Sequence, residues 1–323
     1  MIRPHRRVLS ALLFGLAFAL GLAACAEGGK IGEPGEATAN LIDKDPDNSG
    51  VQITVGSKNF TEQFILGEIY AQALEAAGYD VSKDLNLGSE QIALRALQGG
   101  EVDAYPEYTS TALTSFFDVP PEEVPGDAQQ AFEESKEDFT ELGLVAYPPT
   151  PFSSANAVGL LTERAEELGV ESISDLEDLS EQMALYGSPE CRQRFDCLVG
   201  LRDNYGLGFK SFTPVDIDRR YAVLESGQAD LSILFTTDAQ LFVSAEYVVL
   251  EDDRDVLPAG NVLFVARREI VDEAGPDFAE VVESVQSELT LGVMQELNAR
   301  VDIDRQRPEQ VARGYLEDFG YVR

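Results

Sequence analysis

The chain has 323 residues with a formal net charge of −34 at pH 7, and 44% of its residues are hydrophobic. This length and composition are typical of a globular protein large enough for two lobes with separate cores. The negative charge repels nucleic acid and anionic lipid surfaces, so we expect neither as a partner.

The first 24 residues have the layout of an export signal. Arg3, Arg6 and Arg7 precede an apolar run from Val8 to Ala24, which is too short for a comfortable membrane span. The run ends in Leu22-Ala-Ala-Cys25, which resembles the bacterial lipoprotein signal. That resemblance implies that residues 1–24 are removed and that Cys25 carries a lipid. A plain secretory signal with an incidental cysteine is the alternative.

Removal of this signal also takes away His5, the chain's only histidine. It removes three arginines and no acidic residue, so the net charge falls from −34 to −37. A mature chain without histidine excludes Ser-His-Asp and Cys-His catalysis and histidine-ligated metal sites. We expect no cofactor and no metal. Residues 25–50, rich in Gly, Pro, Asp and Asn, are predicted to be a flexible tether.

The two remaining cysteines, Cys191 and Cys197, are close in sequence. An export signal implies an oxidising compartment, where a nearby pair is more often a disulfide than a metal site. We therefore expect a small surface loop closed around residues 192–196.

The elements of the first lobe follow in the order β-α-β-α-β, which is the beginning of a doubly wound sheet. We expect strands at 51–55, at 85–87 and from 101, with helices ending near Gly78 and Leu97. Asn59 with Glu62 fits a capping box for the first helix, and Ser89 fits an N-cap for the second. A loop that exposes rings and hydroxyls is expected at 105–111.

The middle of the chain predicts a second lobe. Asp127 is expected to cap a helix to Leu142, and Pro148-Pro-Thr-Pro151 marks a crossover. The strands expected after it lie at 156–161, 231–234, 247–250 and 262–266, followed by helices from 276 to 319. We predict a first lobe from 51–152 and 243–323 and a second lobe from 153–242, joined by two crossovers that form a hinge.

One unit occurs twice at a constant offset. Gly100, Asp103, Tyr108 and Thr109 each have a counterpart 127 residues later, at Gly227, Asp230, Phe235 and Thr236. Each unit predicts a helix, a glycine stop, a buried strand and a tip with a ring and a hydroxyl. Ligands of open parallel α/β sheets bind beyond the carboxyl ends of strands, so the two tips would face each other across a cleft. The alternative is that each unit is an ordinary connection from a helix to a strand, since glycine commonly ends helices.

Aromatic rings around such a cleft bind a quaternary ammonium group by cation–π attraction, each contributing roughly 0.5–2 kcal/mol. The rings expected to reach the cleft are Tyr105, Tyr108, Phe152, Tyr221 and Phe235. The alternative for each of them is packing in a core.

Three motifs carry a resemblance to a known family. Gly56-Ser-Lys-Asn-Phe-Thr-Glu-Gln63, Tyr105-Pro-Glu-Tyr-Thr-Ser-Thr111 and Phe235-Thr-Thr-Asp238 resemble substrate-binding lipoproteins of ABC importers for glycine betaine, choline and related osmoprotectants. The resemblance implies an α/β fold with two lobes, periplasmic-binding-protein-like (type II), and no enzymatic activity. It implies ligand contacts from Gln63, Tyr108 and Thr111 in the first lobe, and from Phe235 and Thr236 in the second.

The chain departs from this family at one expected ring. Where relatives with a full tyrosine box carry another tyrosine, this chain has Asn156, and Phe152 is expected to compensate. Lys58 is a candidate donor to a ligand carboxylate, or a solvated turn residue. The resemblance implies an extracytoplasmic, lipid-anchored protein, which we expect to be a monomer, that delivers glycine betaine, choline, carnitine or a similar solute to a permease. The alternatives are another small polar solute, such as an amino acid or polyol, and a secreted hydrolase that uses paired carboxylates.

Overall fold

The computed structural model describes residues 40–323. The predicted signal, Cys25 and the predicted tether up to residue 39 lie outside the described residues. Within residues 40–323, no helix combines the length and the apolar character that a membrane span requires.

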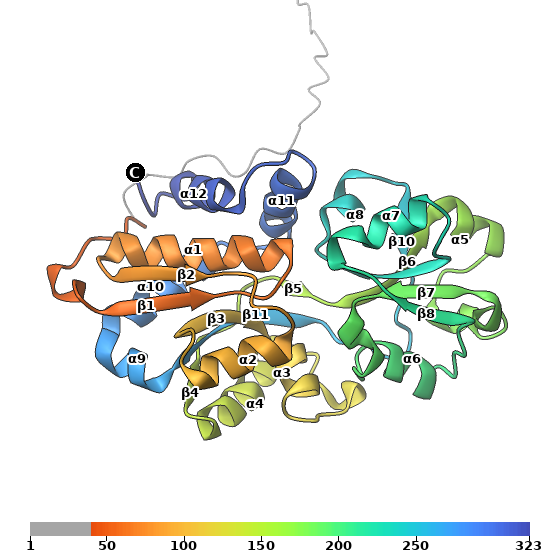
Figure 1. Cartoon of the computed structure of the whole chain (residues 1–323), viewed down its shortest axis with the longest axis horizontal. Helices are drawn as coiled ribbons and strands as arrows, with labels where there is room; N and C mark the ends of the chain where they lie inside the picture. Colours follow the sequence, from red (N-terminus) through yellow and green to blue (C-terminus); the bar gives the residue numbers. More distant parts are fainter. Residues whose placement is uncertain (1–39) are drawn as a thin grey trace, which may run out of the picture. The chain divides into compact units, whose positions relative to one another are not determined.

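Two β-sheets organise the described chain (Figure 1). The first sheet has the strand order β2-β1-β3-β11-β4, with β5 also paired to β11, and the second has the order β10-β6-β9-β7-β8. The strands are β1 (Gln52–Gly56), β2 (Asp80–Asp84), β3 (Ala104–Tyr108), β4 (Leu144–Ala146), β5 (Ser153–Ser154), β6 (Asn156–Leu161), β7 (Ala184–Gly187), β8 (Ser211–Pro214), β9 (Leu231–Phe235), β10 (Tyr247–Val249) and β11 (Gly260–Arg267).

Helices cover both sheets. They are α1 (Thr61–Ala77), α2 (Glu90–Gly99), α3 (Thr109–Ser115), α4 (Ala128–Glu141), α5 (Thr162–Leu168), α6 (Leu198–Asp203), α7 (Arg220–Glu225), α8 (Ala239–Val243), α9 (Arg268–Ala274), α10 (Pro276–Gln286), α11 (Leu291–Asp302) and α12 (Pro308–Asp318). Short 3-10 helices occupy Pro46–Asn48, Pro121–Glu123, Ile173–Leu176, Ser180–Gln182, Pro189–Arg192 and Ile217–Arg219. The two sheets and their covering helices confirm the predicted α/β architecture with two lobes.

The first lobe has one core on each face of its sheet, and β11 contributes to both. Val262, Phe264 and Ala266 pack with α1, α10, α11 and α12, whereas Leu263 and Val265 pack with α2, α3 and α4. This division follows from the two-residue period of a strand, which sends successive side chains to opposite faces. Because β11 lies antiparallel between β3 and β4, the first lobe contains segments from both ends of the chain.

The second crossover comes later in the chain than predicted. β10 pairs with β6, and Val256 and Leu257 belong to the core of the second lobe, so residues 243–257 belong to that lobe. The return to the first lobe occurs where β11 begins at Gly260, beside β5. The sequence prediction was wrong here because a strand of three residues carries no signal that tells which sheet it joins.

Three further local predictions were wrong. The N-cap of α1 is Phe60 rather than Asn59, and Glu62 points into the interior instead of closing a capping box. The second strand is β2 and not the predicted 85–87. The prediction missed β2 because it is an edge strand whose side chains are mostly exposed and form no apolar run. Residues 40–50 are not a free tether, since the Ile42 N–H donates to the Tyr321 carbonyl and the buried Asn48 amide to the Ala77 carbonyl, each at 3.0 Å.

The repeated unit has the same geometry in both lobes. Gly100 and Gly227 end their helices in the left-handed region, at φ of 73° and 68°. Asp103 and Asp230 then accept a hydrogen bond from the neighbouring parallel strand, at the N–H of Thr54 (2.9 Å) and of Ala184 (2.8 Å). The carboxylate of each unit therefore fixes the start of a buried strand, β3 or β9. The predicted exposed loop at 105–111 is wrong, since β3 is buried and runs directly into α3.

Candidate functional site

A cavity lies at the ends of the two repeated strands, and residues of both lobes line it. Its lining includes Lys58, Phe60, Glu90, Tyr108 and Thr111 from the first lobe, and Asn156, Arg194, Asp196, Arg220 and Phe235 from the second. Five of the ten predicted contact residues are among them: Lys58, Tyr108, Thr111, Asn156 and Phe235. The repeat therefore locates the cavity, as the position of ligands beyond strand ends predicts.

Three aromatic rings form one wall of the cavity. Tyr108 ends β3 and Phe235 ends β9, and Phe60 lies between them. The Phe60 ring centroid is 6.3 Å from that of Tyr108 in a stacked arrangement, and 5.2 Å from that of Phe235. Sequence reasoning missed Phe60, although it stands inside the motif Gly56–Gln63 at the turn between β1 and α1. This wall offers ring faces to a soft cation.

Lys58 is part of a buried ion pair rather than a solvated turn. Its side chain is 5% exposed and its Nζ donates to Oε1 of Glu107, which is fully buried. Glu107 also accepts from the Tyr105 hydroxyl at 2.9 Å and from the Tyr108 N–H at 2.8 Å. The same Nζ lies 4.5 Å from the centroid of the Tyr108 ring. The Glu107 carboxylate thus fixes both Lys58 and Tyr108 on the first lobe's side of the cavity.

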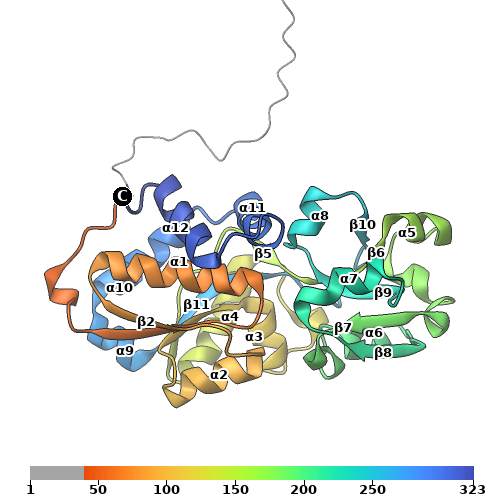
Figure 2. The same ribbon diagram turned by 45° about the horizontal axis from the view of Figure 1, so that its top comes forward.

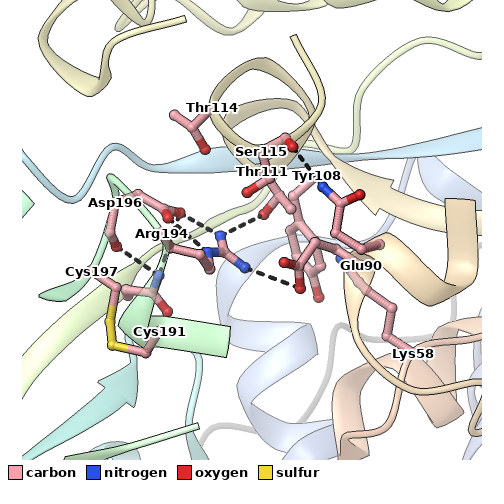
Figure 3. Close-up of polar contacts among 12 residues, drawn as sticks. Lys58, Glu90, Tyr108, Thr111, Thr114, Ser115, Cys191, Arg194, Asp196 and Cys197 are labelled. Atoms are coloured by element: carbon pink, nitrogen blue, oxygen red, sulfur yellow. Dashed lines mark hydrogen bonds and ion pairs between the residues drawn. A yellow bond between two sulfur atoms is a disulfide. The ribbon is translucent and has the colours of Figure 1, made fainter. Parts of the chain in front are cut away.

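The predicted disulfide between Cys191 and Cys197 is confirmed. The loop it closes is more than a surface loop, because both cysteines are buried and Arg194 between them lines the cavity (Figure 3). The Arg194 guanidinium binds Asp196 within the loop, with Nε 2.7 Å from Oδ1.

Arg194 also reaches the first lobe, as Figure 3 shows. Its Nη1 lies 3.5 Å from Oε2 of Glu90, and its Nη2 lies 3.4 Å from the Thr111 hydroxyl. Burial lowers the pKa of the guanidinium, but Asp196 and Glu90 outweigh it, so the pKa is raised and the group stays charged. Sequence reasoning placed Arg194 in the loop but gave it no role, because the contact across the lobes is tertiary.

A third cation lines the second lobe's side of the cavity. The Arg220 guanidinium carbon lies 4.0 Å from the centroid of the Phe235 ring. Its Nη2 donates to Asp238 at 2.9 Å and its Nε to the Ile217 carbonyl at 2.7 Å. Arg220 was also missed by sequence reasoning, which singled out its neighbour Tyr221.

Three predicted rings lie elsewhere. Tyr105 packs in the core on the face of β3 opposite to Tyr108, because residues three apart in a strand point to opposite sides. Phe152 is buried in the first lobe's other core, so it does not compensate for the missing tyrosine. Tyr221 packs edge-on against Tyr247 at 4.8 Å and donates to Asp238 at 2.9 Å. None of the three lines the cavity.

Gln63 and Thr236 support the cavity from behind. The buried Gln63 accepts from the Lys58 N–H at 3.1 Å, which fixes the turn that carries Lys58 and Phe60. The Thr236 hydroxyl accepts from the Ala155 N–H at 3.0 Å, beside the first crossover. Asn156 does line the cavity, and its amide donates to the Asp196 carbonyl at 2.9 Å. The expected fourth ring is therefore replaced by a polar group that braces the disulfide loop.

Comparison with known proteins agrees with the family resemblance of the three sequence motifs. Residues 51–318 match the family described as "Substrate binding domain of ABC-type glycine betaine transport system". The chain is 34% identical over 277 residues to a glycine-betaine-binding protein of Pseudomonas aeruginosa, covering 82% of this chain and 87% of that protein. It is 29% identical over 283 residues to an ergothioneine transport permease/ergothioneine binding protein of Helicobacter pylori, covering 87% of this chain but 49% of that protein.

Solved structures share the fold. A crystal structure of a glycine betaine/carnitine/choline ABC transporter has a TM-score of 0.65 at 22% identity, over 82% of this chain and 97% of that chain. Apo YehZ from Escherichia coli has a TM-score of 0.59 at 26% identity, over 84% and 99%. These likenesses confirm the predicted two-lobed, type II periplasmic-binding-protein fold.

Glu62 gives this region a predicted pH dependence. Burial raises the pKa of its carboxyl, although hydrogen bonds from Tyr108 (2.6 Å) and Asn298 (3.0 Å) oppose the rise. A raised folded-state pKa contributes stability that is fully present below the unfolded value, near pH 4.5, and is lost as the pH rises through the folded value. The free energy of unfolding of the wild type, relative to Glu62→Gln, should therefore decline from pH 4.5 to pH 8 in urea titrations. A constant difference would contradict this assignment.

Proposed function

The chain belongs to the family of substrate-binding domains of ABC-type glycine betaine transport systems, and from this premise we propose that its cavity captures a zwitterionic quaternary ammonium solute. The observation that carries the proposal is the wall of Phe60, Tyr108 and Phe235. A quaternary nitrogen has no proton to donate, so ring faces and shape must bind it. Three rings at roughly 0.5–2 kcal/mol each contribute a substantial part of the roughly 8 kcal/mol binding free energy of a micromolar complex.

Three positive side chains of the lining favour a ligand that carries a carboxylate. Lys58, Arg194 and Arg220 are each paired with an acid, Glu107, Asp196 and Asp238, respectively, and two further acids, Glu90 and Glu190, line the cavity. These acids would tolerate a plain cation, but such a ligand would make no hydrogen bond with the three positive side chains. A betaine brings its own carboxylate, which Arg194 and the Thr111 hydroxyl are placed to bind by charge-assisted hydrogen bonds. We therefore propose glycine betaine, carnitine or a related betaine ahead of choline.

The same pairing argues against the alternative of a hydrolase. Acid–base catalysis by two carboxylates needs one that exchanges a proton with the substrate. Glu107, behind the lining, accepts from Lys58, and Asp196 and Glu90 in the lining bind Arg194. Among the described residues that line the cavity, Glu190 is then the one carboxylate without an ion pair, and it has no second free carboxylate for such catalysis, so the geometry supports binding rather than chemistry.

We further propose that the protein works outside the cytoplasm as a monomer, anchored by a lipid on Cys25, and delivers its solute to the transmembrane subunit of an ABC permease. Family membership supports the permease partner. The lipoprotein-like sequence around Cys25 supports the anchor. Another small polar solute remains an outcome of the binding test, and ergothioneine belongs in the panel because one relative's name includes it.

The aromatic wall generates the first binding prediction. Tyr108→Ala should weaken binding of glycine betaine by about 10- to 100-fold, since a ring face is lost. Tyr108→Phe should cost less, because it retains the ring. Isothermal calorimetry with glycine betaine, carnitine, choline and ergothioneine measures the affinities.

The matched control is Tyr79→Ala, which lies in the same core as Tyr108 but outside the cavity and makes no contact with Glu107. It should lower the melting temperature and leave the affinity of the folded protein unchanged. Unchanged affinity in Tyr108→Ala would place the ligand elsewhere.

Arg194 generates a test of ligand class. Arg194→Ala should reduce affinity for glycine betaine by about 10- to 100-fold, the range of a lost hydrogen bond to a charged group, and affinity for choline much less. Arg192→Ala is the control, because Arg192 belongs to the same loop but lies over Phe212 outside the cavity. Equal losses for both ligands in Arg194→Ala would show that the arginine acts on the loop's structure and not on a carboxylate.

The anchor has its own test. Cys25→Ser should move the protein from the membrane fraction to the soluble fraction, because the lipid attachment site is lost. A variant with both Cys191 and Cys197 replaced by serine should stay with the membrane. Membrane retention of Cys25→Ser would refute lipidation at this residue.

A further inference from the structure

We propose that Asn298, which is outside the lining of the cavity, is a positioning residue that joins the two lobes and thereby sets the ligand affinity; this inference rests on the function proposed above. Asn298 lies on α11 in the first lobe and is 3% exposed. Figure 2 shows α11 next to α8 of the second lobe, and the two helices are in contact. An amide buried at this boundary can bind both lobes at once.

Both hydrogens of the Asn298 amide are used, one in each lobe. The nitrogen donates to Oε2 of Glu62 on α1 at 3.0 Å, and to the backbone carbonyl of Thr237 at 3.0 Å. Thr237 follows β9 and is two residues beyond Phe235. The bond to Thr237 therefore ties the first lobe to the segment that carries the second lobe's ring.

The bond to Glu62 extends this connection to Tyr108, the first lobe's ring. Oε1 of Glu62 accepts from the Tyr108 hydroxyl at 2.6 Å. The hydrogen-bonded series thus runs behind the cavity from Tyr108 through Glu62 and Asn298 to the Thr237 backbone, which follows Phe235. The series exists only while the lobes are together, since separation of the lobes breaks the bond to Thr237.

Breaking this bond has a modest cost. When the lobes separate, the Asn298 amide is exposed to the pocket between them and water replaces Thr237 as its acceptor, so the cost is that of one hydrogen bond within the protein exchanged for one with water. The series therefore favours the closed arrangement before any ligand contact is counted. Because apparent affinity scales with the fraction of molecules in the binding-competent state, Asn298 strengthens binding without touching the ligand.

The chain provides a matched control in Asn48. It is 6% exposed, and its amide likewise donates to a backbone carbonyl, that of Ala77 at 3.0 Å, and to a carboxylate, that of Asp277 at 3.4 Å. Both of these partners belong to the first lobe. Asn48→Ala removes the same chemistry as Asn298→Ala without touching the boundary between the lobes.

The experiment compares the two variants by calorimetry with glycine betaine, by thermal unfolding and by small-angle X-ray scattering without ligand. Asn298→Ala should weaken binding about tenfold, the effect of one hydrogen bond, and should increase the ligand-free radius of gyration. Asn48→Ala should lower the melting temperature while leaving affinity and radius at the wild-type values. Combining Asn298→Ala with Tyr108→Phe should cost less than the sum of the single losses, because both act through Glu62.

Wild-type affinity and an unchanged radius in Asn298→Ala would overturn the proposal, as would equal losses of affinity in both variants. If Asn298→Ala does not fold, Asn298→Ser, which retains one donor, should give an intermediate loss of affinity, and wild-type affinity in it counts against the proposal. If the wild type binds none of the betaines, the proposed function fails, but the ligand-free scattering still decides whether Asn298 holds the lobes together.

Discussion

The buried carboxylate of Glu107 is the constraint on which the candidate site depends. A carboxylate without contact to solvent is unfavourable unless cations and donors surround it. Its partners are Lys58, the Tyr105 hydroxyl and the Tyr108 N–H. Satisfying Glu107 therefore fixes the end of β3, the turn after β1 and the ring of Tyr108 together. These contacts hold the first lobe's part of the aromatic wall in place, because a movement that breaks them leaves the buried Glu107 charge unpaired.

The sequence predicted those parts of the site that depend on local pattern. The repeat at an offset of 127 residues found both strands, and the structure shows why it repeats: Asp103 and Asp230 each bind the backbone of a neighbouring strand. Strand parity would even have excluded Tyr105, since it stands three residues from Tyr108 and must point to the other face of the sheet. The sequence therefore contains the information that separates the two tyrosines.

Other parts of the site could not be predicted because they depend on which segments meet. Arg194 and Asn298 are far in sequence from their partners Thr111 and Glu62, and no local pattern marks either contact. Asn59 had a better N-cap side chain than Phe60, yet the helix begins after Phe60, whose ring packs between Tyr108 and Phe235. Tertiary packing outweighed a capping preference of about 1 kcal/mol.

Long-range and short-range electrostatics have different roles in this protein. The net charge of −34 produces an attractive field for cations, but salt screens it within about 10 Å. Inside the cavity each lining cation has an acid partner, and Glu90 and Glu190 also line it, so the orientation of a zwitterion must come from individual contacts. A betaine is neutral overall, so this long-range field does not attract it as a whole. In the proposed binding mode the rings contact its ammonium end and Arg194 contacts its carboxylate, so selection depends on the cavity and not on the net charge.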